Sequence, residues 1–148
     1  MECIFLFIYY YYLYSFFFFF LCFYILAKKG RNIVGVGFTL VFQVSQHLRD
    51  EGILMSLVDY FSCGRYVQRK STEWGHYSCT KFADNYSIKE FFDKYPIRGA
   101  KAKDFADWTK AAKIIKNGGH LTIEGATEIN NLKAGMNTNR TEDLNYIA

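Results

Sequence analysis

The chain has 148 residues, a formal net charge of +4, and aromatic residues at 20% of its positions. This length fits one ordinary domain, and the mild positive charge suits a nucleic acid or an anionic membrane without choosing between them. The four cysteines, Cys3, Cys22, Cys63 and Cys79, show no C-x-x-C spacing, so neither a disulfide framework nor a zinc site is expected.

The start of the chain differs in composition from the rest. Residues 3–27 carry no charge, which exceeds the length of about 18 apolar residues that indicates a transmembrane helix. Lys28 and Lys29 would keep the C-terminal side on the positive-inside face. The tyrosine and phenylalanine runs are unusual for a bilayer centre, so a second interpretation is translated A/T-rich sequence upstream of the true start.

Composition therefore predicts three parts. Residues 1–27 form the apolar segment, either an artefactual start or a membrane helix. A domain covers residues 28–140, and a polar tail covers residues 141–148.

The stretch Val36–Gln46 alternates apolar and polar residues. Such period-two alternation predicts a strand with one buried face. Two further runs on either side of the turn-like STEWG sequence predict a hairpin over Arg65–Phe82. The outward positions of these strands define the polar sheet face, which contains cations, hydroxyls and amides and no carboxylate: Thr39, Val41, Gln43, Ser45, Arg65, Val67, Arg69, His76, Ser78 and Thr80. This composition favours a polyanion as partner.

Helical spacing predicts the remaining elements. One helix is expected over Arg49–Ser62, and a capping box at Ser87 predicts a second that Pro96 ends. A third is expected from about Lys103 and a fourth from Thr122. The pattern is α+β, with an antiparallel sheet and helices packed on one of its faces.

The sequence offers no other catalytic pattern. His47, His76 and His120 are scattered without metal-ligand spacing, so no metal ligand is assigned. Ser45 and Ser78 lack the context of an activated nucleophile.

Four blocks occur in order between residues 42 and 140: FQVSQHLRDEGILMSLVDYFSCGRY, CTKFADN, FFDKYPIRGAKAKDF and HLTIEGATEINNLKAGMNTNR. In this order and spacing they strongly resemble the LAGLIDADG homing endonucleases of organellar group I introns. The resemblance covers about residues 28–140. It implies an αββαββα fold, of which this chain has a part, with the sheet lying as a saddle on the DNA major groove.

The resemblance also implies a site. The segment PIRGAKAKDF resembles the family segment that carries a lysine near the scissile phosphates, which makes Lys101 the candidate catalytic residue and Lys103 its alternative. The family uses Mg²⁺, held by carboxylates from two paired helices before the first strand. No LAGLIDADG-like string is present, and Glu2 is the only acid among the first 49 residues, so no ligand is identified.

The leading hypothesis is therefore a DNA-binding homing endonuclease domain, by resemblance a site-specific double-strand DNA endonuclease. Without the carboxylate motif we expect no cleavage by the chain as written. An RNA maturase that helps intron splicing, and a membrane-anchored protein of unknown role, remain alternatives. The implied partners are double-stranded DNA, intron RNA, and a second copy or second repeat. The implied location is the mitochondrion or chloroplast.

Overall fold

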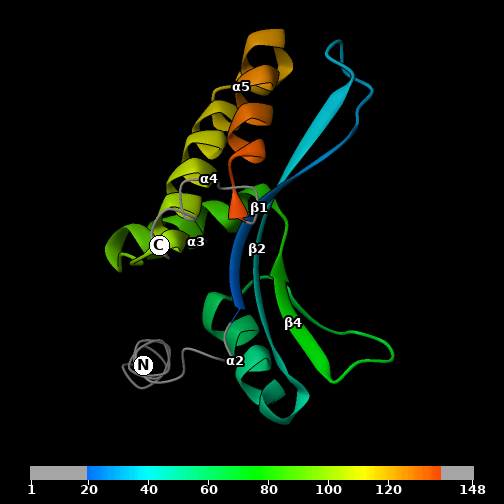
Figure 1. Cartoon of the computed structure of the whole chain (residues 1–148), viewed down its shortest axis with the longest axis vertical. Coiled ribbons are helices and arrows are strands. Elements are labelled where there is room, and N and C mark those ends of the chain that lie inside the picture. Colours follow the sequence, from blue (N-terminus) through cyan, green and yellow to red (C-terminus); the bar gives the residue numbers. More distant parts are fainter. Residues whose placement is uncertain (1–19, 138–148) are drawn as a thin grey trace, which may run out of the picture. The chain divides into compact units, whose positions relative to one another are not determined.

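The computed structural model describes residues 20–137. The chain forms one four-stranded antiparallel sheet with strand order β1-β2-β4-β3, joined to α-helices in an α+β arrangement (Figure 1). The predicted fold class is confirmed. In chain order the elements are β1 Phe20–Lys29, β2 Val36–His47, α2 Glu51–Phe61, β3 Arg65–Gln68, β4 Trp74–Cys79, α3 Phe82–Lys94, α4 Ala100–Lys116 and α5 Ile123–Ala134, with 3₁₀ turns at Leu48–Asp50 and Gly119–Leu121.

The strand β1 corrects the expectation for the apolar segment. Its residues Phe20–Lys29 include the last part of that segment, so residues 20–27 form a strand and the expected boundary after Ala27 falls inside it. The physical reason is alternation, because Phe23 and Ile25 are buried while Leu26 is exposed. Residues 1–19, which carry the rest of the segment, lie outside the described residues. No helix in the described part is long and apolar enough to cross a bilayer.

A short hairpin joins β1 to β2. The Gly30 N–H donates to the Gly35 carbonyl at 2.9 Å, and the Asn32 side-chain amide donates to the Val36 carbonyl at 2.8 Å. Gly35 has a φ of +73°, which glycine adopts without a steric penalty. The turn therefore sets the two strands antiparallel.

The chain divides into two compact units. Unit 1 contains Gln43–Ser78 and the residues before Cys22, and unit 2 contains Cys22–Phe42 and the residues from Cys79 onward. The core of unit 2 is aromatic, with Phe23 at its centre. The Phe23 ring centroid lies 5.1–5.4 Å from the ring centroids of Phe42, Phe92, Phe105 and Trp108. Tilted and edge-to-face contacts at these separations add to the hydrophobic stabilisation.

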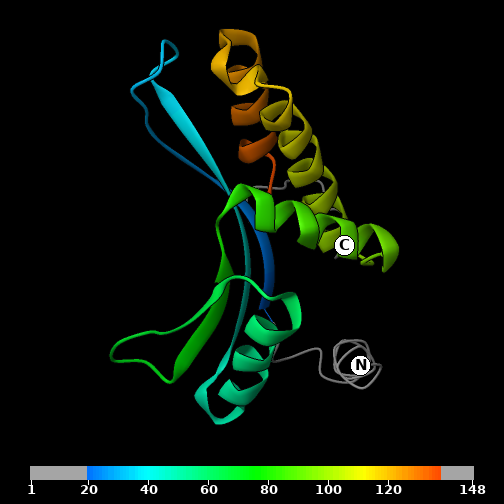
Figure 2. The same ribbon diagram turned by 180° about the vertical axis from the view of Figure 1, so that it is seen from behind.

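Helices α4 and α5 lie side by side in unit 2, as both ribbon views show (Figure 2). Thr122 caps α5 by accepting from the Gly125 N–H at 3.1 Å, which confirms the predicted helix start. A Cβ atom on Gly125 would lie 2.1 Å from the Gly119 carbonyl oxygen, so only glycine fits where α5 meets the preceding turn. These local contacts fix the direction of α5 along α4.

Two helices begin earlier than the sequence predicts. Helix α3 starts at Phe82 and not at the capping box of Ser87, and α4 starts at Ala100 and not near Lys103. Asn85 explains the first difference, since its fully buried side-chain amide donates to the Leu40 and Cys79 carbonyls at 2.8 and 3.2 Å. Tertiary hydrogen bonds therefore outweigh the local capping signal.

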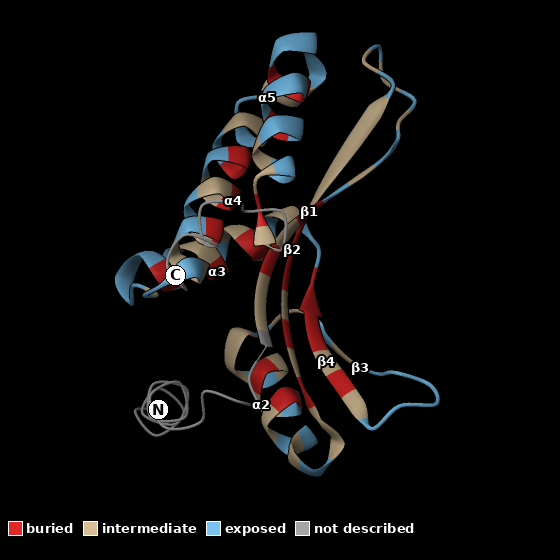
Figure 3. Ribbon diagram, viewed as in Figure 1, coloured by how far each residue is buried: buried red, intermediate tan, exposed pale blue. Residues whose placement is uncertain are grey.

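In unit 1, α2 packs on the hairpin of β3 and β4. Leu54 and Leu57 are its buried residues, which appear as red bands on α2 (Figure 3). The Tyr77 hydroxyl donates to the Cys63 carbonyl at 3.0 Å. Gly64, at φ +77°, permits this contact, because a Cβ there would lie 2.5 Å from the Tyr77 ring.

We predict that Asn85→Ala lowers the free energy of unfolding by about 2–4 kcal/mol, because it removes two buried hydrogen bonds, those to the Leu40 and Cys79 carbonyls. Urea denaturation followed by circular dichroism measures the change. Asn130→Ala, at an exposed position of α5, is the matched control and should be nearly neutral. Equal stability of the two variants would contradict the anchoring role.

Candidate nucleic-acid interface

Unit 1 contains seven of the ten residues predicted for the polar sheet face. Arg65 pairs with Ser78 and Val67 pairs with His76 across the β3–β4 hairpin. Directly opposed residues of antiparallel strands point to the same side, so these four share one face. On β2, the Gln43 side-chain amide donates to the Ser45 hydroxyl at 3.0 Å, which shows that these two also share a face. Arg69 follows β3, and its N–H donates to the Trp74 carbonyl at 3.0 Å.

Exposure separates these positions into three groups. Arg65 and Arg69 are exposed, while Gln43, Ser45, Val67 and His76 are half-buried. Ser78 is 8% exposed, so its hydroxyl offers little surface. The guanidinium groups are therefore the most accessible part of this face.

The remaining three predicted positions belong to unit 2. Thr39 is half-buried, and Thr80 is exposed just after β4 ends at Cys79. Val41 is 1% exposed, so its side chain belongs to the core in this structure. The prediction that Val41 belongs to the polar sheet face does not agree with this burial, because alternation alone does not account for the neighbours that cover the side chain.

The electrostatics of the unit 1 face are set by its two arginines. Burial lowers the pKa of His76, and the positive charges of Arg69 and Arg65 lower it further. His76 is therefore an uncharged imidazole at neutral pH, with a buried Nδ1 that has no hydrogen-bond partner among the described residues. The face combines two permanent cations with neutral donors and acceptors.

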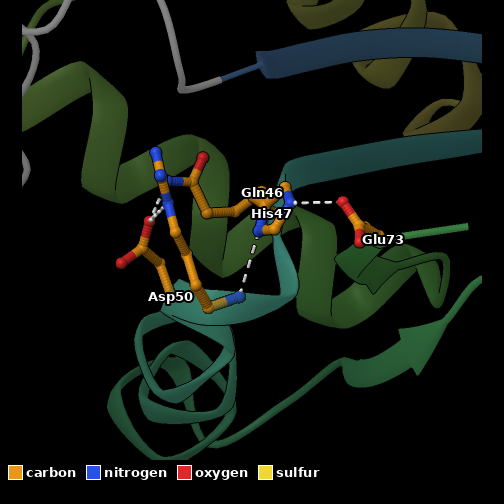
Figure 4. Close-up of polar contacts among 5 residues, drawn as sticks. Gln46, His47, Asp50 and Glu73 are labelled. Carbon is orange, nitrogen blue, oxygen red and sulfur yellow. Dashed lines mark hydrogen bonds and ion pairs between the residues drawn. The ribbon is translucent and has the colours of Figure 1, made fainter.

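Three of the acids in unit 1 are engaged by groups other than Arg65 and Arg69. Asp50 accepts from the Gln46 side-chain amide at 3.1 Å and from Arg49 at 3.4 Å, while Glu73 lies 3.1 Å from His47 (Figure 4). Glu51, in α2, accepts from the Tyr66 hydroxyl at 2.9 Å. Tyr66 alternates with Arg65 along β3, so this acid lies on the helix side of the sheet.

A second polar cluster lies in unit 2 at the beginning of β1. It contains Lys101, which the sequence placed in a loop but which lies in the first turn of α4. The Lys101 Nζ lies 3.6 Å from Asp104 Oδ2 and donates to Asn137 Oδ1 at 3.1 Å. The Asn137 amide donates to the Phe23 carbonyl at 2.9 Å, and the Cys22 thiol donates to Asn137 Oδ1 at 3.2 Å. We call these four residues, Cys22, Lys101, Asp104 and Asn137, the lysine cluster.

The lysine cluster distinguishes the two lysines that the sequence left as alternatives. Lys101 is a member of it, whereas Lys103 is an exposed residue of the same helical turn. The sequence analysis did not identify Asp104 and Asn137 as site residues. The Lys-x-x-Asp spacing of Lys101 and Asp104 could have indicated their ion pair, but nothing local connects either residue to Asn137.

The lysine cluster does not suit a magnesium ion as it stands. Magnesium prefers oxygen ligands in octahedral geometry. The one carboxylate of the cluster, Asp104, is already engaged by the Lys101 ammonium and by the Asn137 N–H at 3.0 Å. A thiol and an ammonium complete the set, and neither is a ligand that magnesium prefers.

The model of the LAGLIDADG endonuclease family matches residues 22–112, and this chain belongs to that family. The recognition made from the four sequence blocks is confirmed. Probable intron-encoded endonuclease 2 of Neurospora crassa is 38% identical over 103 residues, which cover 69% of this chain and 23% of that protein. The uncharacterized cox1 intron-2 37.2 kDa protein of Schizosaccharomyces pombe is 32% identical over 76 residues, covering 51% of this chain and 24% of that protein.

Solved structures of LAGLIDADG endonucleases also match this chain. The meganuclease I-SmaMI bound to uncleaveable DNA is 41% identical with a TM-score of 0.78, over 81% of this chain and 42% of that chain. The endonuclease I-LtrWI bound to target DNA is 34% identical with a TM-score of 0.77, over 81% of this chain and 41% of that chain. I-SmaMI bound to uncleaved DNA with calcium ions present also matches, as do its mutants in which one or two lysines are replaced by alanine. This chain thus spans about a quarter of the curated relatives and less than half of the solved enzymes.

We predict that Lys101→Met slows alkylation of Cys22. Burial raises the pKa of the Cys22 thiol, the nearby Lys101 charge lowers it, and Asp104 raises it. Loss of the lysine charge should raise the pKa further and reduce the reactive thiolate at pH 8.5. Mass spectrometry after timed iodoacetamide labelling measures the rate, with Cys63 of unit 1 as the internal reference. An unchanged or faster rate would contradict the cluster.

Proposed function

We propose that this chain binds duplex DNA as one repeat of a homing endonuclease, using the polar sheet face, and that site-specific double-strand cleavage needs a second repeat. The observation that carries the proposal is the β3–β4 hairpin of unit 1, in which the exposed Arg65 pairs with Ser78 on the face that also carries His76. A second exposed arginine, Arg69, directly follows β3. DNA-bound relatives of the same fold support it.

The chemistry of the face suits the two parts of DNA recognition. Arg65 and Arg69 are permanent cations that would contact phosphates, and such contacts supply affinity that depends on salt. Gln43 carries a side-chain amide, which pairs well with an adenine edge in the major groove. His76, uncharged between the arginines, would add a donor or acceptor without adding charge.

Cleavage would need Lys101 of unit 2 and metal-binding carboxylates that the described residues do not supply. A positive Lys101 would stabilise negative charge that develops on the scissile phosphate. Magnesium would activate the attacking water when carboxylates hold it, and the described residues supply no such set. Since the chain spans 42% of I-SmaMI, a second copy or a second repeat is the natural source of the missing half.

The likeness to intron-encoded proteins supports an organellar origin, with the mitochondrion favoured by the cox1 intron relative. The described residues offer no observation that favours an intron maturase or a membrane-anchored protein over a DNA-binding domain. Duplex DNA is therefore the partner we propose.

We predict that replacing Arg65 and Arg69 together by alanine weakens DNA binding and reduces the slope of log affinity against log salt by about 2, because two phosphates are no longer neutralised. Fluorescence anisotropy of the full chain with labelled duplex, titrated at several salt concentrations, measures both quantities. Lys110→Ala plus Lys113→Ala on α4 is the charge-matched control. Unchanged affinity and slope in the arginine variant would refute the face assignment.

We also predict that the full chain with magnesium binds, but does not cut, duplex that contains the intron-less target site. The physical reason is the missing carboxylate set, because the one carboxylate of the lysine cluster, Asp104, is already engaged by Lys101 and by the Asn137 N–H. Gel analysis after incubation shows the outcome, with I-SmaMI on its own DNA as the positive control. Metal-dependent double-strand cleavage by this polypeptide alone would overturn the proposal.

A further inference from the structure

A lysine ammonium on a long side chain is ordinarily mobile, and ordering it costs up to about 2 kcal/mol of side-chain entropy. Lys101 is a candidate for such mobility, because its side chain is 35% exposed. It nevertheless has two oxygen partners at defined places: an ion-pair partner on its own helix and a hydrogen-bond acceptor 36 residues later in the chain. How firmly these acceptors are themselves held decides whether the ammonium has a fixed place.

Asp104 is the more deeply buried acceptor, with a side chain 3% exposed. Its Oδ1 accepts from the Asn137 backbone N–H at 3.0 Å, which fixes the plane of the carboxylate and leaves Oδ2 toward Lys101. Asn137 reaches this position with a φ of +54°, in the left-handed region that asparagine enters more readily than most residues. The carboxylate is therefore aimed by the backbone that follows α5.

Asn137 supplies the second acceptor, and β1 fixes its orientation. Its Nδ2 donates to the Phe23 carbonyl at 2.9 Å, so the amide cannot turn without losing that bond. Its Oδ1 then faces Lys101 at 3.1 Å and the Cys22 thiol at 3.2 Å. Through this amide the lysine is connected directly to the first strand.

We propose that Asp104 and Asn137 are a positioning pair, which holds the Lys101 ammonium at the start of β1 with N–H donors left for a phosphate oxygen. An ammonium has three donors. Asn137 accepts a hydrogen bond from one of them at 3.1 Å, and Asp104, at 3.6 Å, holds the ammonium by charge. A donor held in advance loses less entropy when it meets the phosphate than a free lysine would. The contact with a phosphate rests on the proposed function, whereas the positioning of Lys101 by Asp104 and Asn137 does not.

The test is pulsed acetylation of the full chain, with mass spectrometry of each lysine in the absence of DNA. Asp104→Asn keeps the shape and the Oδ1 acceptor but removes the charge that faces Lys101. Acetylation of Lys101 should then rise at least about three-fold, the scale of a partly exposed ion pair. Asn137→Ala should also raise the acetylation of Lys101. This second variant tests the proposal if Asp104→Asn does not fold.

The matched control is Asp107→Asn. Asp107 lies 3.6 Å from Lys110 on the same helix, with the same three-residue spacing and the same separation as the Lys101–Asp104 pair. This control should change Lys110 and leave Lys101 unaffected. A merely structural role would raise the labelling of many lysines together. Unchanged Lys101 labelling in folded Asp104→Asn and Asn137→Ala variants would overturn the positioning pair.

A second arm adds duplex DNA. The proposed function predicts that DNA protects Lys101 of the unmodified chain, and that Asp104→Asn reduces this protection. If the chain binds no DNA, the proposed function fails, while the DNA-free labelling still decides whether the pair positions the lysine. If DNA binds without protecting Lys101, the phosphate role of the ammonium is wrong.

Discussion

The alternation of side chains along β2 is the constraint on which the rest of the structure depends. Leu40, Phe42 and Val44 are buried and must be covered by helices, while Gln43 and Ser45 beside them remain in contact with each other on the other side. A shift of one residue in register would exchange the two sets. The same strand thus turns one set of side chains into the core, and of the other set Gln43 and Ser45 stay half-buried while Val41 is covered.

Aromatic packing in the core fixes where β1 lies against the helices of unit 2. In unit 2, Phe23 contacts Phe42 of β2 and Trp108 of α4, which fixes the start of β1 against α4. The lysine cluster lies one residue from this aromatic contact, because Cys22 precedes Phe23. Packing of rings therefore brings a thiol from one end of the described chain to an amide from the other.

Much of the fold was accessible from sequence because it is encoded locally. The period-two pattern predicted β2 and the hairpin, and Thr122 predicted the start of α5. What failed were features that tertiary contacts decide. Helix α3 begins early because Asn85 donates a hydrogen bond to the Leu40 carbonyl, far away in sequence. Strand β1 was not predicted because its apolar residues continue a run that is also typical of a membrane helix. At the candidate interface, the period-two spacing of side chains was enough to predict that Arg65 and Arg69 share a face. The contact of Lys101 with Asn137 could not be predicted in this way, because the two residues are 36 positions apart.

The central claim is that the polar sheet face contacts DNA. The most direct measurement is photo-crosslinking of the full chain to radiolabelled duplex, with a photoreactive amino acid placed either at Gln43 on β2 or at Lys113 on α4. The account predicts a salt-sensitive crosslink from position 43 and little or none from position 113. A crosslink from position 113 with none from position 43 would show that DNA lies on the helices, and would contradict the account.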